Sequence, residues 1–157
     1  MSLNPYAKFL NERDPVEVMA ATPERLEELV GGMTHEQADA PIAPGKWSVR
    51  EIVAHLADAE IGFGFRLRQT LGGEGFLQPF DQDAWAKSYA RYTLPAALEC
   101  FRALRAWNLL LVRGVSEAEK ALVAHHPERG DMVMWTIVET MAGHDVNHLL
   151  QLEKVTF

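Results

Sequence analysis

The feature that most constrains the fold is a strongly marked helix start in the first third of the chain. Ser48 is a preferred N-cap residue, and Glu51 follows three residues later, so the two form a capping box. Trp47 and Ile52 occupy the two positions of a hydrophobic staple. This start fixes the phase of the helix, and apolar residues continue from Ile52 at helical spacing. His55 belongs to that apolar stripe, so we predict that it faces the core.

Helical periodicity recurs along the whole chain, whereas the alternation that marks a strand is scarce. We expect short helical turns at the sequences THEQA and SEAE and around Trp85, and a turn at HHPERGD. Pro23 predicts a kink or two abutting helices inside the first long helical segment. The expected long helices cover residues 14–30, 48–71, 95–113 and 132–154.

These elements predict one domain, residues 1–157, long enough to bury a core. Four long helices with a long crossover between the second and the third predict an all-α four-helix bundle. Cys100 is the single cysteine, which excludes an internal disulfide and a thiolate zinc cage. We expect Cys100 to be a small core residue.

The charge pattern argues against a nucleic-acid partner. The formal net charge is −7, and the chain has no basic run of the kind that binds phosphates. No apolar run approaches the ~20 residues of a membrane span, so we expect no membrane partner. The first residues lack the apolar core of a signal peptide, and a cytoplasmic protein is the simplest expectation.

A pair of histidines near the end of the chain is the main functional signal. His144 and His148 are four residues apart on the inward stripe of the last helix. At ~1.5 Å rise per residue, two imidazoles then share one face about 6 Å apart along the axis. Burying unpartnered imidazoles costs roughly 1–3 kcal/mol each, a cost that a metal removes.

His55 on a facing helix completes a three-histidine set that predicts a metal site with room for water or substrate. The alternative is that hydrogen bonds satisfy each histidine and no metal binds. Neutral imidazole suits zinc, nickel, iron, manganese or copper. We expect a divalent ion, zinc or nickel first, with iron or manganese as alternatives.

Residues around the three histidines have two possible roles. Each ligating ring must donate its other N–H to a partner. Thr140 and Gln151 are placed to accept such bonds, or are ordinary polar helix positions. Asp58 and Glu60 are expected to be solvated, although Glu60 is the runner-up for a fourth ligand.

The remaining polar residues near these motifs are not predicted to be ligands. Asp145 and Asn147 flank the last histidine pair but point to other faces of the helix. His125 and His126 lie in a turn and are expected to be exposed, with the minor alternative that one lines the mouth of a pocket. His35 is expected at the surface, and no residue is assigned as a general base.

The segments KWSVREIVAHLADAE (46–60) and HDVNHLLQLEK (144–154) resemble the DinB superfamily. NPYAKFLNERDPVEVM, FDQDAW, ALECFRALRAWNLLL and the HPERG turn extend the resemblance over nearly the whole chain. It implies a four-helix bundle, commonly a homodimer, with a metal held by one histidine of the second helix and an i, i+4 pair of the last. In this sequence those positions are His55, His144 and His148.

The resemblance also implies a choice of functions. Some members of the family are transferases or isomerases that use bacillithiol or mycothiol, so one possibility is a metal-dependent enzyme. Such an enzyme would transfer a small-molecule thiol to an electrophilic substrate, with the metal lowering the thiol pKa, or would perform a hydrolysis. The alternative is a non-catalytic, metal-stabilised bundle that binds a small ligand or a protein. A pocket with open metal positions favours the enzyme, whereas a closed site with a fourth protein ligand favours the binding protein.

Overall fold

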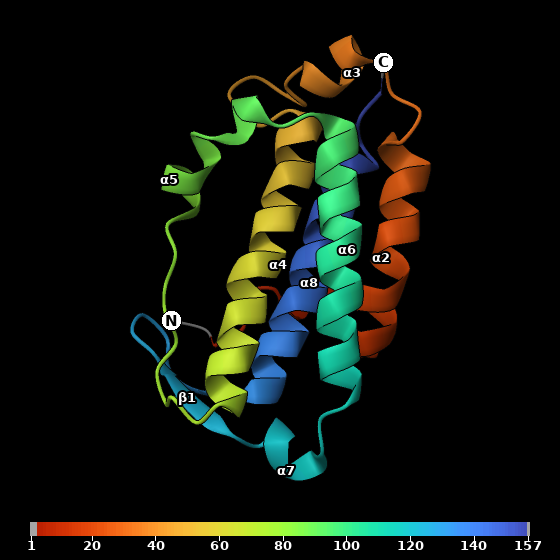
Figure 1. Ribbon diagram of the computed structural model, residues 1–157. Helices are drawn as coiled ribbons and strands as arrows, with labels where there is room; N and C mark the ends of the chain where they lie inside the picture. The colour runs from red at the N-terminus through yellow and green to blue at the C-terminus, as the bar shows by residue number, and fades with distance from the viewer. Residues whose placement is uncertain (1–2, 157) are drawn as a thin grey trace.

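Four long helices form the body of the molecule, which confirms the predicted bundle (Figure 1). A computed structural model describes residues 3–156. The long helices are α2 (Pro15–Val30), α4 (Val49–Leu71), α6 (Leu94–Arg113) and α8 (Met134–Leu152). The short ones are α1 (Ala7–Leu10), α3 (His35–Asp39), α5 (Gln82–Ala86), the 3₁₀ helix η1 (Tyr89–Arg91) and α7 (Glu117–Lys120).

The order of helix directions explains the long crossover. The colour gradient in Figure 1 shows α4 and α6 running side by side in one direction and α2 and α8 running in the other. Parallel neighbours cannot be joined by a short turn, so the chain must return along the bundle before α6 begins. Residues 72–93 make this return and carry α5 and η1 along one side of α4.

The capping box predicted at the start of α4 is present. The Ser48 hydroxyl accepts a hydrogen bond from the Glu51 backbone N–H at 3.2 Å, and the Glu51 carboxylate accepts from the Ser48 N–H at 2.8 Å. Thr34 and Ser116 form the same motif at the starts of α3 and α7. These local bonds satisfy backbone donors that the first helical turn leaves unpaired.

The first long helix continues through Pro23, where we predicted a kink or a break. Proline has no N–H, so the Met19 carbonyl lacks its usual helical partner. The Arg105 guanidinium of α6 donates to that carbonyl at 2.9 Å instead. A tertiary hydrogen bond therefore replaces the missing helical one, and α2 remains a single element.

A β-hairpin precedes the last helix, where we predicted only a turn. Strands β1 (Val123–His126) and β2 (Gly130–Val133) pair antiparallel. Each has four residues, too few for strand alternation to stand out in the sequence. Because β2 includes Met132 and Val133, α8 begins at Met134 and not at Met132. The helix ends at Leu152.

The hairpin also anchors the crossover. The Leu77 N–H donates to the His125 carbonyl at 2.9 Å, and the His125 N–H donates to the Gly75 carbonyl at 3.0 Å. The Gln69 side chain of α4 accepts from the Gln78 N–H at 3.0 Å. The start of the crossover is thus tied to both β1 and α4, which fixes the segment that follows.

The core fills the space between the four long helices, and α6 contributes a stripe that includes Ala97, Phe101 and Leu109. Cys100 lies off this stripe and is exposed, so the prediction that it is a core residue is wrong. Among residues 3–156, no helix has the length and apolarity needed to cross a membrane.

Candidate metal centre

The three predicted histidines meet inside the bundle. The Nε2 atom of His55, on α4, lies 2.9 Å from Nε2 of His144, on α8. Nε2 of His148, one helical turn further along α8, lies 3.2 Å from the same atom. All three side chains are buried. The i, i+4 spacing and the packing of α4 against α8 thus bring three ring nitrogens to one point.

This donor set fits a divalent cation. A neutral imidazole nitrogen offers either one N–H or one lone pair, so Nε2 of His144 cannot hydrogen-bond both neighbours at once. Two nitrogens held at about 2.05 Å from zinc at tetrahedral angles lie about 3.3 Å apart, close to the observed separations. Within the described part of the chain, no fourth histidine, cysteine or carboxylate joins the cluster.

Neighbouring side chains orient two of the rings. Nδ1 of His148 lies 3.1 Å from Oε1 of Gln151, an acceptor, so Nδ1 carries the hydrogen and Nε2 presents its lone pair. Nδ1 of His55 lies 3.4 Å from the Tyr89 hydroxyl, which hydrogen-bonds the half-buried Asp58 carboxylate. Gln151 therefore has the predicted contact with a histidine.

Thr140 does not have that contact, because its hydroxyl donates to the Thr136 carbonyl at 2.6 Å. Tyr89 was not predicted at all. It comes from η1 in the crossover, and only the tertiary structure brings it to the site.

Burial keeps the three rings neutral. Desolvation and the neighbouring His148 lower the pKa of His55 to about 3. Burial lowers the pKa of His148 to about 4, although the Gln151 hydrogen bond raises it slightly against that trend. Burial and the two other rings hold the pKa of His144 well below its ordinary value. The histidines are therefore in the form that ligates metal at neutral pH.

A cavity of about 210 Å³ opens onto the histidine cluster. Its walls come from α4, α8, the N-terminal segment, the crossover and the hairpin, and both apolar rings and charged side chains line it. Phe63 and Phe80 are the rings, and Arg66, Arg129, Glu128 and His126 are the charged or titratable side chains, that line it beside His55 and His144.

Two glycines let aromatic segments approach the site. A Cβ atom at Gly62 would lie 2.5 Å from the Phe80 ring, and one at Gly143 would lie 2.6 Å from the Tyr6 carbonyl oxygen. The Tyr6 ring meets the edge of the His144 ring with centroids 5.1 Å apart. Glycine at these two positions therefore allows the crossover and the N-terminal segment to close over the cavity.

Glu60 is buried, which contradicts the expectation that it is solvated, and it does not join the histidines. Its carboxylate accepts from Nη2 of Arg105 at 2.7 Å and from the Asn108 amide at 3.0 Å. Asp145 points away from the histidines, as predicted, and accepts from both Arg105 Nη atoms at 2.6 and 2.9 Å. Thr22 donates to Asp145 at 2.9 Å and completes this ionic cluster.

The other histidines separate into surface and pocket positions. His35 and His125 are exposed, as predicted. His126 is only 2% exposed and lines the cavity. The alternative prediction, that one of the two turn histidines lines a pocket, is therefore correct for His126. Successive residues of a strand point to opposite faces, which sends His125 outward and His126 inward.

Known proteins with similar sequences cover most of this chain. A protein of Oceanobacillus iheyensis is 29% identical over 133 residues, which cover 83% of this chain and 77% of that protein. YfiT of Bacillus subtilis is 25% identical over 149 residues, covering 88% and 82%. Both carry names that propose a metal-dependent hydrolase.

Solved structures are similar as well. YfiT, described as having an unusual four-helix bundle topology, superposes with a TM-score of 0.83 at 23% identity, covering 90% of this chain and 83% of its own. A mycothiol-dependent maleylpyruvate isomerase gives a TM-score of 0.71 at 12% identity, covering 97% of this chain and 63% of its own. Residues 19–152 match the sequence pattern of one family, and the chain therefore belongs to the DinB superfamily.

Proposed function

We propose that the protein is a metal-dependent enzyme in which His55, His144 and His148 hold one divalent cation. The observation that carries the proposal is the convergence of three buried, neutral imidazoles at a cavity, with no fourth protein ligand in the described chain. Such a site has positions open to substrate. The names of the relatives support metal dependence. We propose zinc or nickel, with iron or manganese as alternatives.

The site combines a metal position with a pocket lined by aromatic and charged side chains. When bound, a divalent cation lowers the pKa of water or a thiol and supplies a nucleophile at neutral pH. Tyr89 and Gln151 hold the rings of His55 and His148 in their ligating orientation. Phe63 and Phe80 add aromatic surface to the walls of the cavity.

Hydrolysis is the reaction we propose first, because the relatives at 25% and 29% identity are named as hydrolases. Transfer of a small-molecule thiol, of the bacillithiol or mycothiol type, to an electrophile is the second candidate. The mycothiol-dependent isomerase that shares the fold supports it. A closed site with four protein ligands would have supported a non-catalytic bundle, and the open cavity argues against that alternative.

The two reactions differ in their need for a thiol. We would screen the metal-loaded protein against small esters, amides and electrophiles, with and without bacillithiol or mycothiol, beside His148→Ala. Turnover without thiol supports hydrolysis, and turnover only with thiol supports transfer. Activity that His148→Ala retains in full would contradict the metal proposal.

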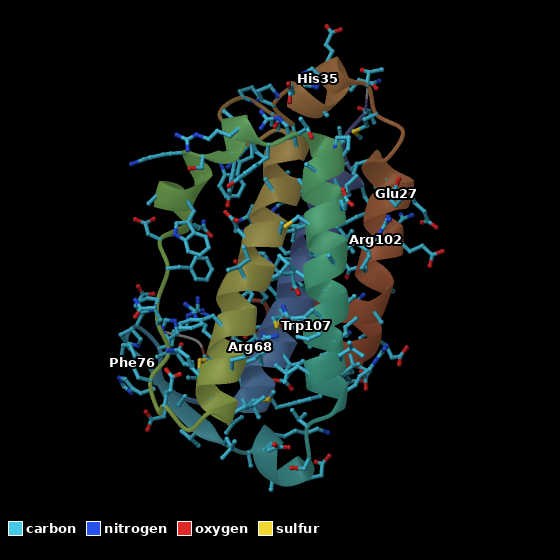
Figure 2. All side chains as sticks on the ribbon, viewed as in Figure 1. Glu27, His35, Arg68, Phe76, Arg102 and Trp107 are labelled. Carbon is cyan, nitrogen blue, oxygen red and sulfur yellow. The ribbon has the colours of Figure 1, made fainter. Side chains whose placement is uncertain are left out.

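We also propose that the protein forms a homodimer through the outer face of α4 and α6. Ile61 and Phe65 on α4 are 47% and 51% exposed, and Trp107 and Leu110 on α6 are 64% and 67% exposed. Figure 2 shows Trp107 on the outer side of the α4–α6 pair, and none of the four lines the metal cavity. Exposed apolar patches of this kind mark protein interfaces. Light scattering should give twice the chain mass for wild type and a monomer for Trp107→Glu.

A further inference from the structure

We propose that the cavity beside the three histidines contains an oxyanion subsite made of Arg66, Arg129 and His126. The substrate would accordingly be a small molecule that carries a carboxylate or a phosphate. The subsite's role in catalysis rests on the proposed function, whereas its ability to bind an anion does not.

Arg66 is a buried cation that forms no ion pair within the described chain. Its side chain lies on α4, on the same stripe as His55, and is only 8% exposed. Among residues 3–156, no carboxylate lies within 4 Å of its guanidinium nitrogens. Buried arginines are normally paired, as Arg105 is with two carboxylates in the same bundle. An oxyanion in the cavity would supply the missing partner.

The guanidinium of Arg66 is also held in a fixed orientation. Its Nε atom donates to the Gln78 carbonyl at 3.1 Å. Its Cζ atom lies 5.0 Å from the centre of the Phe80 ring and 5.8 Å from that of Phe63. The two Nη groups make no hydrogen bond within the described chain, so they are the donors left for a bidentate contact with an oxyanion.

Arg129 and His126 add donors from the hairpin. Arg129 is half-buried and makes no side-chain ion pair or hydrogen bond in the described chain. Nδ1 of His126 accepts from the Glu128 backbone N–H at 3.2 Å, and burial together with Arg66 and Arg129 lowers the pKa of this histidine. A neutral ring that accepts at Nδ1 carries its hydrogen on Nε2. His126 therefore adds a third donor to the cavity lining.

The balance of charge in the cavity remains positive. Burial and the Arg129 charge lower the pKa of Arg66 to about 10, which leaves it protonated at neutral pH. Among the described residues, Glu128 is the one carboxylate that lines the cavity, and it is exposed. Two guanidinium groups thus face one carboxylate. The volume, about 210 Å³, is below the roughly 300–1,000 Å³ of pockets for drug-sized ligands, so the bound anion must be small.

The test is an anion titration of the full chain after removal of metal with a chelator. Acetate and inorganic phosphate are the two probes, and the guanidinium Nε–H resonances are followed by NMR. We expect saturable binding with a shift of the Arg66 signal. The probe that binds more tightly identifies the substrate group as carboxylate or phosphate. Absence of saturable binding by either probe would overturn the proposal.

Variants separate the subsite from general charge effects. Arg66→Gln and Arg129→Gln should each weaken binding at least about tenfold, the loss expected when a charge-assisted hydrogen bond is removed. Arg113→Gln removes the same charge from an exposed position outside the cavity and should leave the affinity unchanged. Glu128→Gln should strengthen binding. Equal weakening by Arg113→Gln and Arg129→Gln would overturn the proposal.

Because Arg66 packs against aromatic rings, its variant can fail to fold, and Arg129→Gln then carries the test alone. Metal content, measured on each protein before the chelator is added, keeps the two proposals apart. Anion binding that persists in a His148→Ala protein with normal metal content would contradict the metal site only. Full metal content without anion binding in wild type would contradict the subsite only.

Discussion

Two polar clusters lie side by side in the core of the bundle, and they differ in how completely they are satisfied. In the ionic cluster, Arg105 donates to Glu60 at 2.7 Å and to Asp145 at 2.6 and 2.9 Å. In the histidine cluster, His144 lies next to Asp145 in the sequence, yet its Nε2 atom faces only two other imidazole nitrogens. Both clusters connect α4 with α8.

The difference shows which of the two clusters requires a ligand from solution. Among the side-chain polar atoms of the described chain that are fully shut off from solvent, only Arg105 Nε has no partner, so the ionic cluster is almost complete in itself. The histidine cluster is not, because one nitrogen cannot hydrogen-bond two neighbours. We therefore interpret the ionic cluster as a device that holds the helices together and the histidine cluster as a binding site.

The largest effect should come from breaking the ionic cluster. Arg105→Met leaves two buried carboxylates without their cation and also removes the donor to the Met19 carbonyl. We expect the free energy of unfolding to fall by about 3–5 kcal/mol in urea denaturation. Arg102→Met removes an arginine of α6 whose ion pair with Glu27 is exposed, as Figure 2 shows, and serves as the matched control. A loss for Arg105→Met no greater than that of the control would contradict the structural role.

The second-largest effect should be a loss of stability at low pH that comes from the histidine cluster. Below about pH 6.5 the unfolded chain protonates its histidines, whereas His148 and His55 in the metal-free folded protein do so only near about pH 4 and about pH 3. The unfolded state binds more protons in that window, so stability falls as pH falls, by roughly 1.4 kcal/mol per pH unit for each ring. Replacing His148 with Gln should reduce this slope in pH-dependent urea melts. Exposed His35→Gln is the control, and an equal change in both would refute the assignment.

The smallest effect should come from a site outside both clusters. Ser48→Ala removes the cap of α4 and should cost ~1 kcal/mol of stability. Metal content should stay unchanged, because the cap acts on helix stability and not on the ligands. An unchanged unfolding midpoint would mean that the cap does not contribute to the stability of α4.

The parts of the molecule predicted from the sequence are those with local signals. The capping box at Ser48 sets the phase of α4, and the spacing of His144 and His148 sets their common face, so both helices and the meeting of three histidines follow. Arg66 had a usable signal, since it lies eleven residues after His55 on the same stripe, and a charged residue on an apolar stripe indicates a buried role.

Other features had no local signal. Glu60 was expected in solvent because its partner Arg105 lies 45 residues later, on another helix. His126 faces the cavity because a short hairpin alternates its side chains, and that hairpin is stabilised by contacts with the crossover. In each case the position of the side chain depends on pairing between segments far apart in the chain.

The most direct test of the three-histidine metal site is elemental analysis of untagged protein purified without chelator, with His55→Ala measured beside wild type. We predict close to one divalent metal per chain in wild type and its loss in the variant. Equal metal content in the two proteins would contradict the three-histidine site. So would a wild-type protein that stays metal-free after incubation with zinc, nickel, manganese and iron(II).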